Sequence, residues 1–283
     1  MQIAGVLVLY HPDNNILLNI KSYIDSVDKL YVIDNSENKN NELTHQVKAL
    51  SNKCIYIDNN GNQGIAQALN LGARLAIEDG ASWLLTMDQD SQFNENNLDT
   101  MIEEIKDCSL EDNIVLLSPM HLQKEIDNYK MYYDYITMTS GNLIKLKVLQ
   151  QLGGFEEKLF IDCVDTDYCL RIKQYGFKIK RFKNILLEHE LGQKQTNRYF
   201  TFAQHNYIRS YYMMRNRLYL WNKYSDVYSD YIRYEKLITI KAIIKIILLE
   251  SDKLKKLKMI YRGYRDYERN IFGKYNEQLK ERI

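Results

Sequence analysis

The sequence predicts an α/β fold in which helices flank a mixed, mostly parallel sheet. Four apolar runs of strand length stand at residues 3–10, 29–36, 53–58 and 82–88, and helical spacing of apolar residues separates them at 16–27, 41–51 and 65–80. Continuous apolar runs are typical of strands buried on both faces. Their alternation with helices indicates a doubly wound sheet.

Beyond residue 95 the alternation is weaker. We expect a helix at 97–107, a strand at 114–120, a strand or loop entering a helix near Ser140, an acidic helix from 164 and strand structure over 177–192. A helical pattern follows from about 197 to 270. We therefore predict an α/β domain over 1–196, with halves at about 1–95 and 96–196, and a helical C-terminal extension over 197–283.

Charge is unevenly divided along the 283 residues. Residues 1–193 hold 18 basic and 28 acidic side chains, whereas residues 194–283 hold 20 and 9. The basic C-terminal region suggests an anionic partner. The four cysteines form no CxxC pair and no signal peptide stands at the N-terminus, so we expect a cytoplasmic chain with reduced thiols.

Polar residues follow the ends of the predicted strands. Asp34 ends the second strand, Asn62 and Gly64 follow the third, and Asp88 and Asp90 end the fourth. Ligands of doubly wound folds bind at the carboxyl ends of strands. Three polar clusters from separate segments are therefore expected at one edge of the sheet.

Each cluster allows two interpretations. Asp88 and Asp90 either form a solvated turn or bind Mg²⁺ or Mn²⁺, which prefer carboxylate oxygens and take further ligands from a substrate's phosphates. The loop around Gly64 is either an ordinary strand-to-helix turn or a backbone cradle for a phosphate or nucleoside. Asp34 either caps a turn or accepts from a nucleoside.

A second acidic group stands at residues 162–167. Asp167 and Arg171 have i,i+4 spacing, which favours a structural ion pair on a helix. Asp162 and Asp165 remain, and one of them could act as a general base on a substrate hydroxyl. His189, after an apolar run, is either a structural histidine or a nitrogen donor beside the Asp pair.

Taken together and in this order, these motifs resemble the family 2 glycosyltransferases of GT-A fold, and among them the bacterial rhamnosyltransferase-like branch. The motifs are "VIDNS", "NGNQGIAQALNLGARLA", "LLTMDQDS", the stretch from "TSGNLIKLK" to "VDTDYCLRIKQYGFKI", and "EHELG". The resemblance spans about residues 3–192, with a looser match at 211–224.

The resemblance implies a role for each residue. Asp34, with Tyr10 beside it, would bind the nucleobase; Asp88 and Asp90 match the DxD motif that holds the nucleotide-sugar and the metal; His189 matches a metal ligand. Asp165 would be the catalytic base. The family's preceding Glu is replaced by Val164, a gap that Asp162 would have to fill. Ser140, Gly141 and Asn142 match a loop near the acceptor and the donor sugar.

The implied reaction is inverting, metal-dependent transfer of a sugar from a nucleotide-sugar to a glycan or lipid-linked acceptor in cell-surface polysaccharide synthesis. The branch implies dTDP-L-rhamnose as donor, and UDP-galactofuranose, UDP-glucose or UDP-galactose are the alternatives. A nucleotidyltransferase or a non-catalytic nucleotide-binding protein is the rival of another class. The first strand end, "LVLYHPDNN", lacks the Gly-rich basic signature of a nucleotidyltransferase.

The region 237–265 combines an apolar helical pattern with a Lys/Arg cluster. It is either a core helix with a solvated basic neighbour or a site of peripheral contact with the inner face of an anionic membrane. Dimerisation through the same region is a further possibility and is compatible with membrane contact. No RNA-binding motif accompanies the basic residues, so we expect no nucleic-acid partner.

Overall fold

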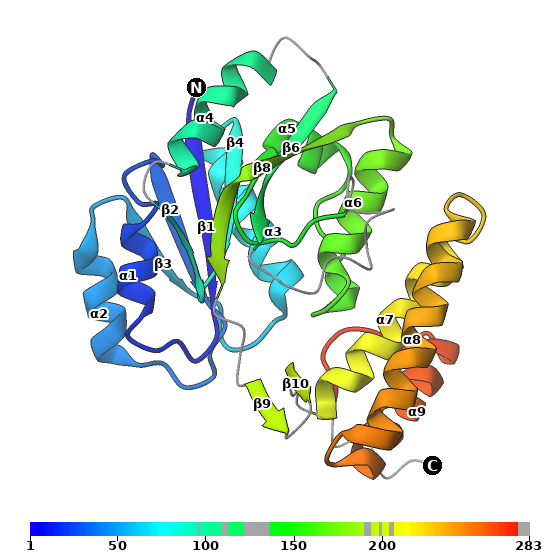
Figure 1. The fold of residues 1–283 in the computed structure, drawn as a ribbon. Helices are drawn as coiled ribbons and strands as arrows, with labels where there is room; N and C mark the ends of the chain where they lie inside the picture. Colours follow the sequence, from blue (N-terminus) through cyan, green and yellow to red (C-terminus); the bar gives the residue numbers. More distant parts are fainter. Residues whose placement is uncertain are drawn as a thin grey trace. The chain divides into compact units, whose positions relative to one another are not determined.

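The protein is described by a computed structural model over residues 1–94, 97–108, 113–121, 136–189, 194–197, 200–203 and 207–276. An eight-stranded sheet has the order β3-β2-β1-β4-β7-β6-β8-β5 (Figure 1). The strands are β1 (Ile3–Leu9), β2 (Lys29–Asp34), β3 (Cys54–Asp58), β4 (Trp83–Asp88), β5 (Ser91–Phe93), β6 (Ile114–His121), β7 (Asn142–Lys145) and β8 (Lys178–His189). The pairs of β1 with β2 and β4, β2 with β3, and β6 with β8 are parallel, whereas the pairs of β7 with β4 and β6, and of β5 with β8, are antiparallel. The predicted mixed, mostly parallel sheet is thus confirmed.

Helices cover both faces of the sheet. One face packs against α1 (Ile16–Lys21), α2 (Asn41–Leu50) and α4 (Asn97–Cys108), which share a hydrophobic core with alternate residues of β1, such as Leu7 and Leu9. The other face of β1 packs against α3 (Ile65–Glu78). Every residue of β1 is buried, which explains why its sequence is apolar at every position rather than at alternate ones.

Helix α3 lies unusually close to β1. A Cβ atom added at Gly72 would lie 2.2 Å from Cγ2 of Val6. The buried face of α3 is otherwise made largely of alanines, including Ala66, Ala73 and Ala76. Small residues therefore let the helix backbone approach the strand, and this fixes the N-terminus of α3 at the carboxyl edge of the sheet.

Local predictions differ from the structure at three places. The segment after Ser140 forms strand β7 before α5 (Leu146–Gln151), because Asn142–Lys145 completes the sheet beside β4. Helix α1 ends at Lys21, short of the predicted 27, since Tyr23 and Ile24 turn into the core. The helical region expected from 197 begins only at α7 (Tyr207–Tyr224), because 200–203 forms a strand. Residues 129–135, the first part of the segment that we expected to enter a helix near Ser140, lie outside the described residues.

The chain divides into two compact units. One unit holds residues 1–156 and 165–190, and the other holds 157–164 and 191–283. The boundary that we expected near residue 196 stays a prediction, but the short segment 157–164 is grouped with the C-terminal helices rather than with the sheet. Helix α6 (Val164–Gln174) starts where this segment ends.

The C-terminal unit is built from the helices α7 (Tyr207–Tyr224), α8 (Ser229–Leu249) and α9 (Lys253–Glu268), which Figure 1 shows from yellow to red, and from a hairpin of β9 (Lys194–Asn197) and β10 (Phe200–Ala203). Gly263 allows α9 to pack tightly on α7, because an added Cβ would lie 2.4 Å from the carbonyl oxygen of Tyr211. Within the described parts of the chain, none of the helices has both the length and the apolar composition to cross a membrane.

Candidate functional site

Strand register places the predicted polar residues at one edge of the sheet. Leu9, the neighbour of Tyr10, pairs with Asp34 on β2, and Val8 pairs with Asp88 on β4. The antiparallel strand β7 begins at this edge, with Asn142 opposite Thr86. Tyr10, Asp34, Asp88 and the 140–142 loop therefore lie along the carboxyl edge of β1, β2 and β4, where ligands of open α/β sheets bind.

Asp34 is a buried carboxylate with two donors. The backbone N–H of Ser36 donates to Oδ1 at 2.8 Å, and the hydroxyl of Tyr56 donates to Oδ2 at 2.6 Å. Burial and this bond to Asp34 raise the pKa of Tyr56 to about 12, so the phenol keeps its proton. A carboxylate has about four acceptor sites. Asp34 can therefore be held in place and still accept from a nucleoside.

The Asn/Gly loop before α3 is tied to the residue next to Asp34. The amide of Asn35 donates to the carbonyl of Gly64 at 3.1 Å and accepts from Asn59 at 2.6 Å. Oδ1 of Asn62 accepts from the N–H of Gly64 at 3.0 Å, and Gly64 has a φ of 92°, which favours glycine. Asn62 thus shapes the loop, and the first turn of α3 starts beside the Asp34 strand end.

The middle residue of the Asp-Gln-Asp motif fixes the motif to β1. The side chain of Gln89 accepts from the N–H of Tyr10 at 2.8 Å and donates to its carbonyl at 3.2 Å. Asn19 donates to the backbone carbonyl of Gln89 at 2.8 Å. Gln89 therefore pairs in the manner of a strand, while Asp88 and Asp90 on either side are half-buried.

Ser140, Gly141 and Asn142 pack directly against this motif. Oγ of Ser140 accepts from the N–H of Asp88 at 3.0 Å, and the N–H of Gly141 donates to Thr86 at 2.7 Å. Gly141 has a φ of 80°, and a side chain there would collide with Pro119 and Leu187. The loop thus holds Asp88 from the side opposite β1.

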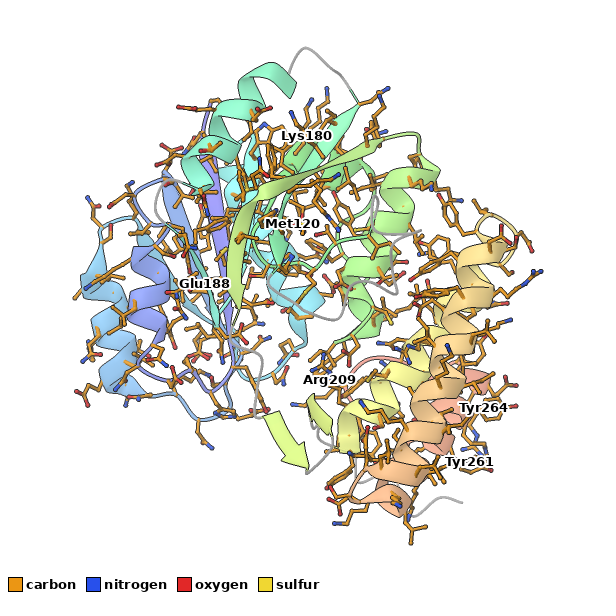
Figure 2. All side chains as sticks on the ribbon, in the orientation of Figure 1. Met120, Lys180, Glu188, Arg209, Tyr261 and Tyr264 are labelled. Carbon is orange, nitrogen blue, oxygen red and sulfur yellow. The ribbon has the colours of Figure 1, made fainter. Side chains whose placement is uncertain are left out.

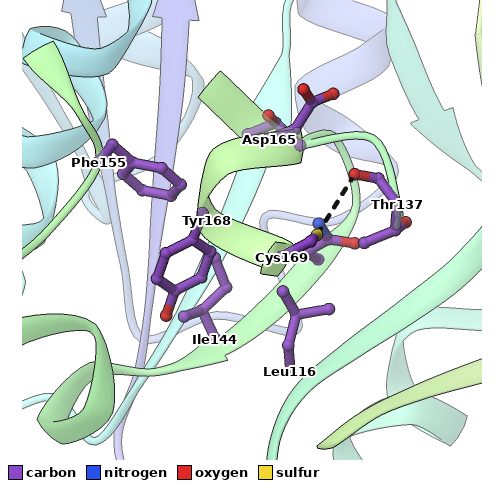
Figure 3. A pocket seen from close by; sticks show the side chains of 9 residues that line it. Leu116, Thr137, Ile144, Phe155, Asp165, Tyr168 and Cys169 are labelled. Atoms are coloured by element: carbon purple, nitrogen blue, oxygen red, sulfur yellow. Dashed lines mark hydrogen bonds between the residues drawn. The ribbon is translucent and has the colours of Figure 1, made fainter. Parts of the chain in front are cut away.

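Asp165 lies in the first turn of α6 and lines a small cavity together with Asn142 (Figure 3). The other lining residues are mostly apolar or hydroxylic: Leu116, Thr137, Thr139, Ile144, Phe155, Tyr168 and Cys169. Oδ1 of Asp165 accepts from the N–H of Thr166 at 2.7 Å. Burial raises the pKa of the Cys169 thiol to about 12, so this cysteine is a neutral packing residue.

The remaining acidic residues of this region have protein partners. Asp167 is fully buried and accepts from Nε of Arg171 at 2.8 Å, the i,i+4 pair that the sequence predicted. Arg171 also donates to the carbonyl of Leu152 at 2.6 Å. Asp162 accepts three bonds, at 2.8, 3.0 and 3.2 Å, from Arg209 of α7, a residue labelled in Figure 2.

His189 is brought to the same edge by its strand. Its backbone pairs with Ser91, the residue after Asp90; its side chain lies outside the described residues. Sequence reasoning missed Gln89, Tyr56 and the buried His121, whose Nε2 lies 2.9 Å from the carbonyl of Ser140. Of these three residues, only Gln89 could have been recognised from the sequence, because it stands between the two aspartates.

The donor chemistry of the edge suits a divalent cation. Asp88 and Asp90 are hard oxygen ligands on one short segment, and Mg²⁺ characteristically uses one or two carboxylates with further ligands from phosphates and water. Within the described residues no group of three or more His, Cys, Asp or Glu side chains is placed to hold a metal. Two carboxylates on one short segment therefore suit a cation that takes its further ligands from a diphosphate and water.

Comparison with known proteins identifies the class. The family described as glycosyl transferase family 2 matches residues 8–174, more than half of the chain and the whole of the edge as far as α6. The protein is a glycosyltransferase. It belongs to glycosyl transferase family 2.

One curated protein is similar in sequence, and one solved structure is similar in fold. The chain is 26% identical over 248 residues to the dTDP-rhamnosyl transferase RfbF of Shigella flexneri, covering 78% of this chain and 80% of that protein. The crystal structure of S. aureus TarS superposes with a TM-score of 0.52 at 12% identity over 94% of this chain. The chain spans 44% of TarS, and at 12% identity this second likeness concerns the fold alone.

Proposed function

We propose that the protein transfers L-rhamnose from dTDP-L-rhamnose, with inversion, to a hydroxyl of a glycan or lipid-linked acceptor. The observation that carries the proposal is the shared cavity of Asp165 and Asn142, because Asn142 continues the loop that holds Asp88. The choice of donor rests on the 26% identity to a dTDP-rhamnosyl transferase. Such a glycan transferase serves the synthesis of cell-surface polysaccharide.

In the proposed reaction Asp34 and Tyr10 hold the nucleobase, and the α3 N-terminus with Asn62 and Gly64 lies beside the nucleoside. The acceptor oxygen forms a bond to the anomeric carbon as the bond from that carbon to the diphosphate breaks. Asp165 takes the proton of the acceptor hydroxyl, and attack from the opposite face inverts the configuration. Asp88, Asp90 and His189 would hold Mg²⁺ or Mn²⁺, which when bound stabilises the negative charge of the leaving diphosphate.

The metal and the nucleotide are tested by thermal shift. We expect dTDP with Mn²⁺ to raise the melting temperature, EDTA to abolish the rise, and Asp88→Asn to lose it. Asp25→Asn, an exposed residue outside the site, is the control and should keep it. A rise with UDP but not dTDP would replace the proposed donor, and no rise with any nucleotide would contradict the site.

The base is tested by Asp165→Asn. Because general base catalysis contributes about 10²–10⁴-fold, turnover should fall by that factor while dTDP binding is kept. A non-catalytic nucleotide-binding protein would show no turnover to lose. Unchanged turnover in Asp165→Asn would show that another group accepts the proton.

Helix α8 supports the proposed peripheral contact with a membrane. Leu237, Ile240, Ile244, Ile247 and Leu248 recur at helical spacing and are each 46–66% exposed. Exposed lysines, among them Lys241 and Lys245, lie on the same helix and suit an anionic surface, each contributing about 1 kcal/mol. We expect sedimentation with phosphatidylglycerol vesicles and not with phosphatidylcholine, reduced in Ile244→Glu. If light scattering shows a dimer and Ile244→Glu dissociates it, these exposed apolar residues of α8 would instead form a subunit interface.

A further inference from the structure

The segment that leads into α6 has an unusual backbone. Phe160, Asp162 and Cys163 have φ values of 67°, 64° and 64°. Residues other than glycine rarely adopt this left-handed conformation, and it persists only where surrounding contacts hold it. Asp165, the proposed base, follows Cys163 by two residues. The backbone at 160–163 therefore leads directly into the first turn of α6, which begins at Val164.

Asn216 of α7 supplies one set of those contacts. It is fully buried, and its single amide nitrogen lies within hydrogen-bond distance of three carbonyl oxygens of the segment. These are Leu159 at 2.9 Å, Ile161 at 2.7 Å and Asp162 at 3.0 Å. In an ordinary helix or strand, the carbonyl groups of such closely spaced residues do not all point toward one donor. The unusual backbone and the buried amide thus fit each other.

Arg215 supplies the second set. Its guanidinium is fully buried and donates to the carbonyls of Leu159 at 3.1 Å and Gly273 at 2.8 Å. Its Nε donates to Oδ1 of Asn216 at 3.1 Å, which orients the Asn216 amide toward the segment. The guanidinium carbon also lies 5.1 Å from the Tyr211 ring centre. A buried cation that bonds mainly to backbone carbonyls is a strong and directional anchor.

Arg209 adds a third anchor, which acts on an acidic side chain of the same segment. It contacts both oxygens of Asp162, the first of the two consecutive left-handed residues Asp162 and Cys163. Phe160 stacks on Tyr212, with ring centres 5.2 Å apart. Helix α7 thus contacts the segment through its backbone, one acidic side chain and one aromatic ring.

We infer that Arg215 and Asn216 are positioning residues for the transfer reaction: they hold residues 159–163 in the conformation that sets the start of α6 and so the place of Asp165. This inference rests on the proposed role of Asp165. It also assigns the C-terminal helices a part in turnover that is separate from any membrane contact. Without the Asn216 amide, residues 160–163 relax toward ordinary conformations and Asp165 loses its alignment.

The test uses the full chain and the variant Asn216→Ala, with Arg217→Ala as the matched control. Arg217 lies on the same helix and pairs with Glu235 of α8 at 3.9 Å, away from the segment. Two quantities are measured well below the melting temperature: amide hydrogen exchange of peptides covering 157–168, and dTDP release from dTDP-L-rhamnose with its kcat and KM. Arg215→Lys, which keeps the charge but not the planar donors, is a second and milder variant.

We expect Asn216→Ala to raise exchange in 157–168 at least tenfold and to lower kcat at least tenfold, with the donor KM within twofold of wild type. Arg217→Ala should change neither quantity. Unchanged kcat in Asn216→Ala, or an equal loss in Arg217→Ala, would overturn the inference. Asp165→Asn measured in parallel separates the two proposals. If Asp165→Asn still releases dTDP at the wild-type rate, Asp165 is not the base. If Asp165→Asn is inactive but Asn216→Ala is fully active, only the positioning role is refuted.

Discussion

Two buried serines near the carboxyl edge offer a matched test of how the Asp-Gln-Asp motif is held. Ser140 and Ser91 are both fully buried. Oγ of Ser140 accepts from the N–H of Asp88 at 3.0 Å, whereas Oγ of Ser91 has no hydrogen-bond partner among the described residues. The same substitution, Ser→Ala, therefore removes a used acceptor in one case and an unused hydroxyl in the other.

The expected costs follow from this difference. Ser140→Ala leaves the Asp88 N–H without that acceptor, and an unsatisfied buried donor costs about 1–3 kcal/mol. Ser91→Ala removes a hydroxyl that makes no bond to the described chain, so its effect should lie near zero. For a domain of about 150–250 residues, each kcal/mol lowers the melting temperature by about 2–4 °C.

The assay is thermal unfolding of both variants, followed by titration with dTDP and Mn²⁺. Ser140→Ala should melt lower and bind the nucleotide more weakly, because the backbone that carries Asp88 is less constrained. Ser91→Ala should match the wild type in melting temperature. Equal losses in the two variants would refute the reasoning, since burial of the hydroxyl and not its bond to Asp88 would then decide stability.

Three further predictions concern packing and pH. Gly72→Ala should cost about 1–3 kcal/mol by overpacking against Val6, seen as a lower urea midpoint, and Val6→Ala should recover part of it. Gly263→Ala should destabilise the C-terminal helices, with faster amide exchange in α7 and α9 than in wild type, because the new methyl would collide with the Tyr211 carbonyl. Tyr56 keeps its proton up to pH about 12 when folded and to about 10 when unfolded, so its contribution to stability is present below pH 10 and declines between these values. Urea midpoints at pH 9 and 11 should therefore fall less in Tyr56→Phe, and an equal fall would contradict the Tyr56 assignment.

Much of the nucleotide half could be predicted because its signals are local. A strand buried on both faces must be apolar at every position, so β1, β2 and β4 are visible in the sequence. Polar residues at their ends then have to share an edge, and the register of Asp34 and Asp88 beside β1 shows that they do. The roles of these residues in the reaction stay proposals.

The parts that could not be predicted depend on partners far away in the chain. Strand β7 is four residues long and gains its structure from β4 and β6, which lie more than 20 residues before it. The left-handed backbone at 160–163 contains no glycine, and the side chains that bond to this segment, Arg215 and Asn216, lie more than 50 residues later. No local pattern of residues can indicate such contacts.

The position of β5 constrains the length of the Asp-Gln-Asp segment. Asp88 ends β4 and Ser91 begins β5, yet four steps of the strand order separate these two strands. In a flat sheet four steps would measure about 19 Å, whereas three residues of chain reach at most about 11 Å. The sheet must therefore curl so that the end of β8 lies near the end of β4. Gln89 and Asp90 span the short gap between the end of β4 and the start of β5. One extra residue inserted there would loosen this closure and move His189 away from Asp88, with every carboxylate still present.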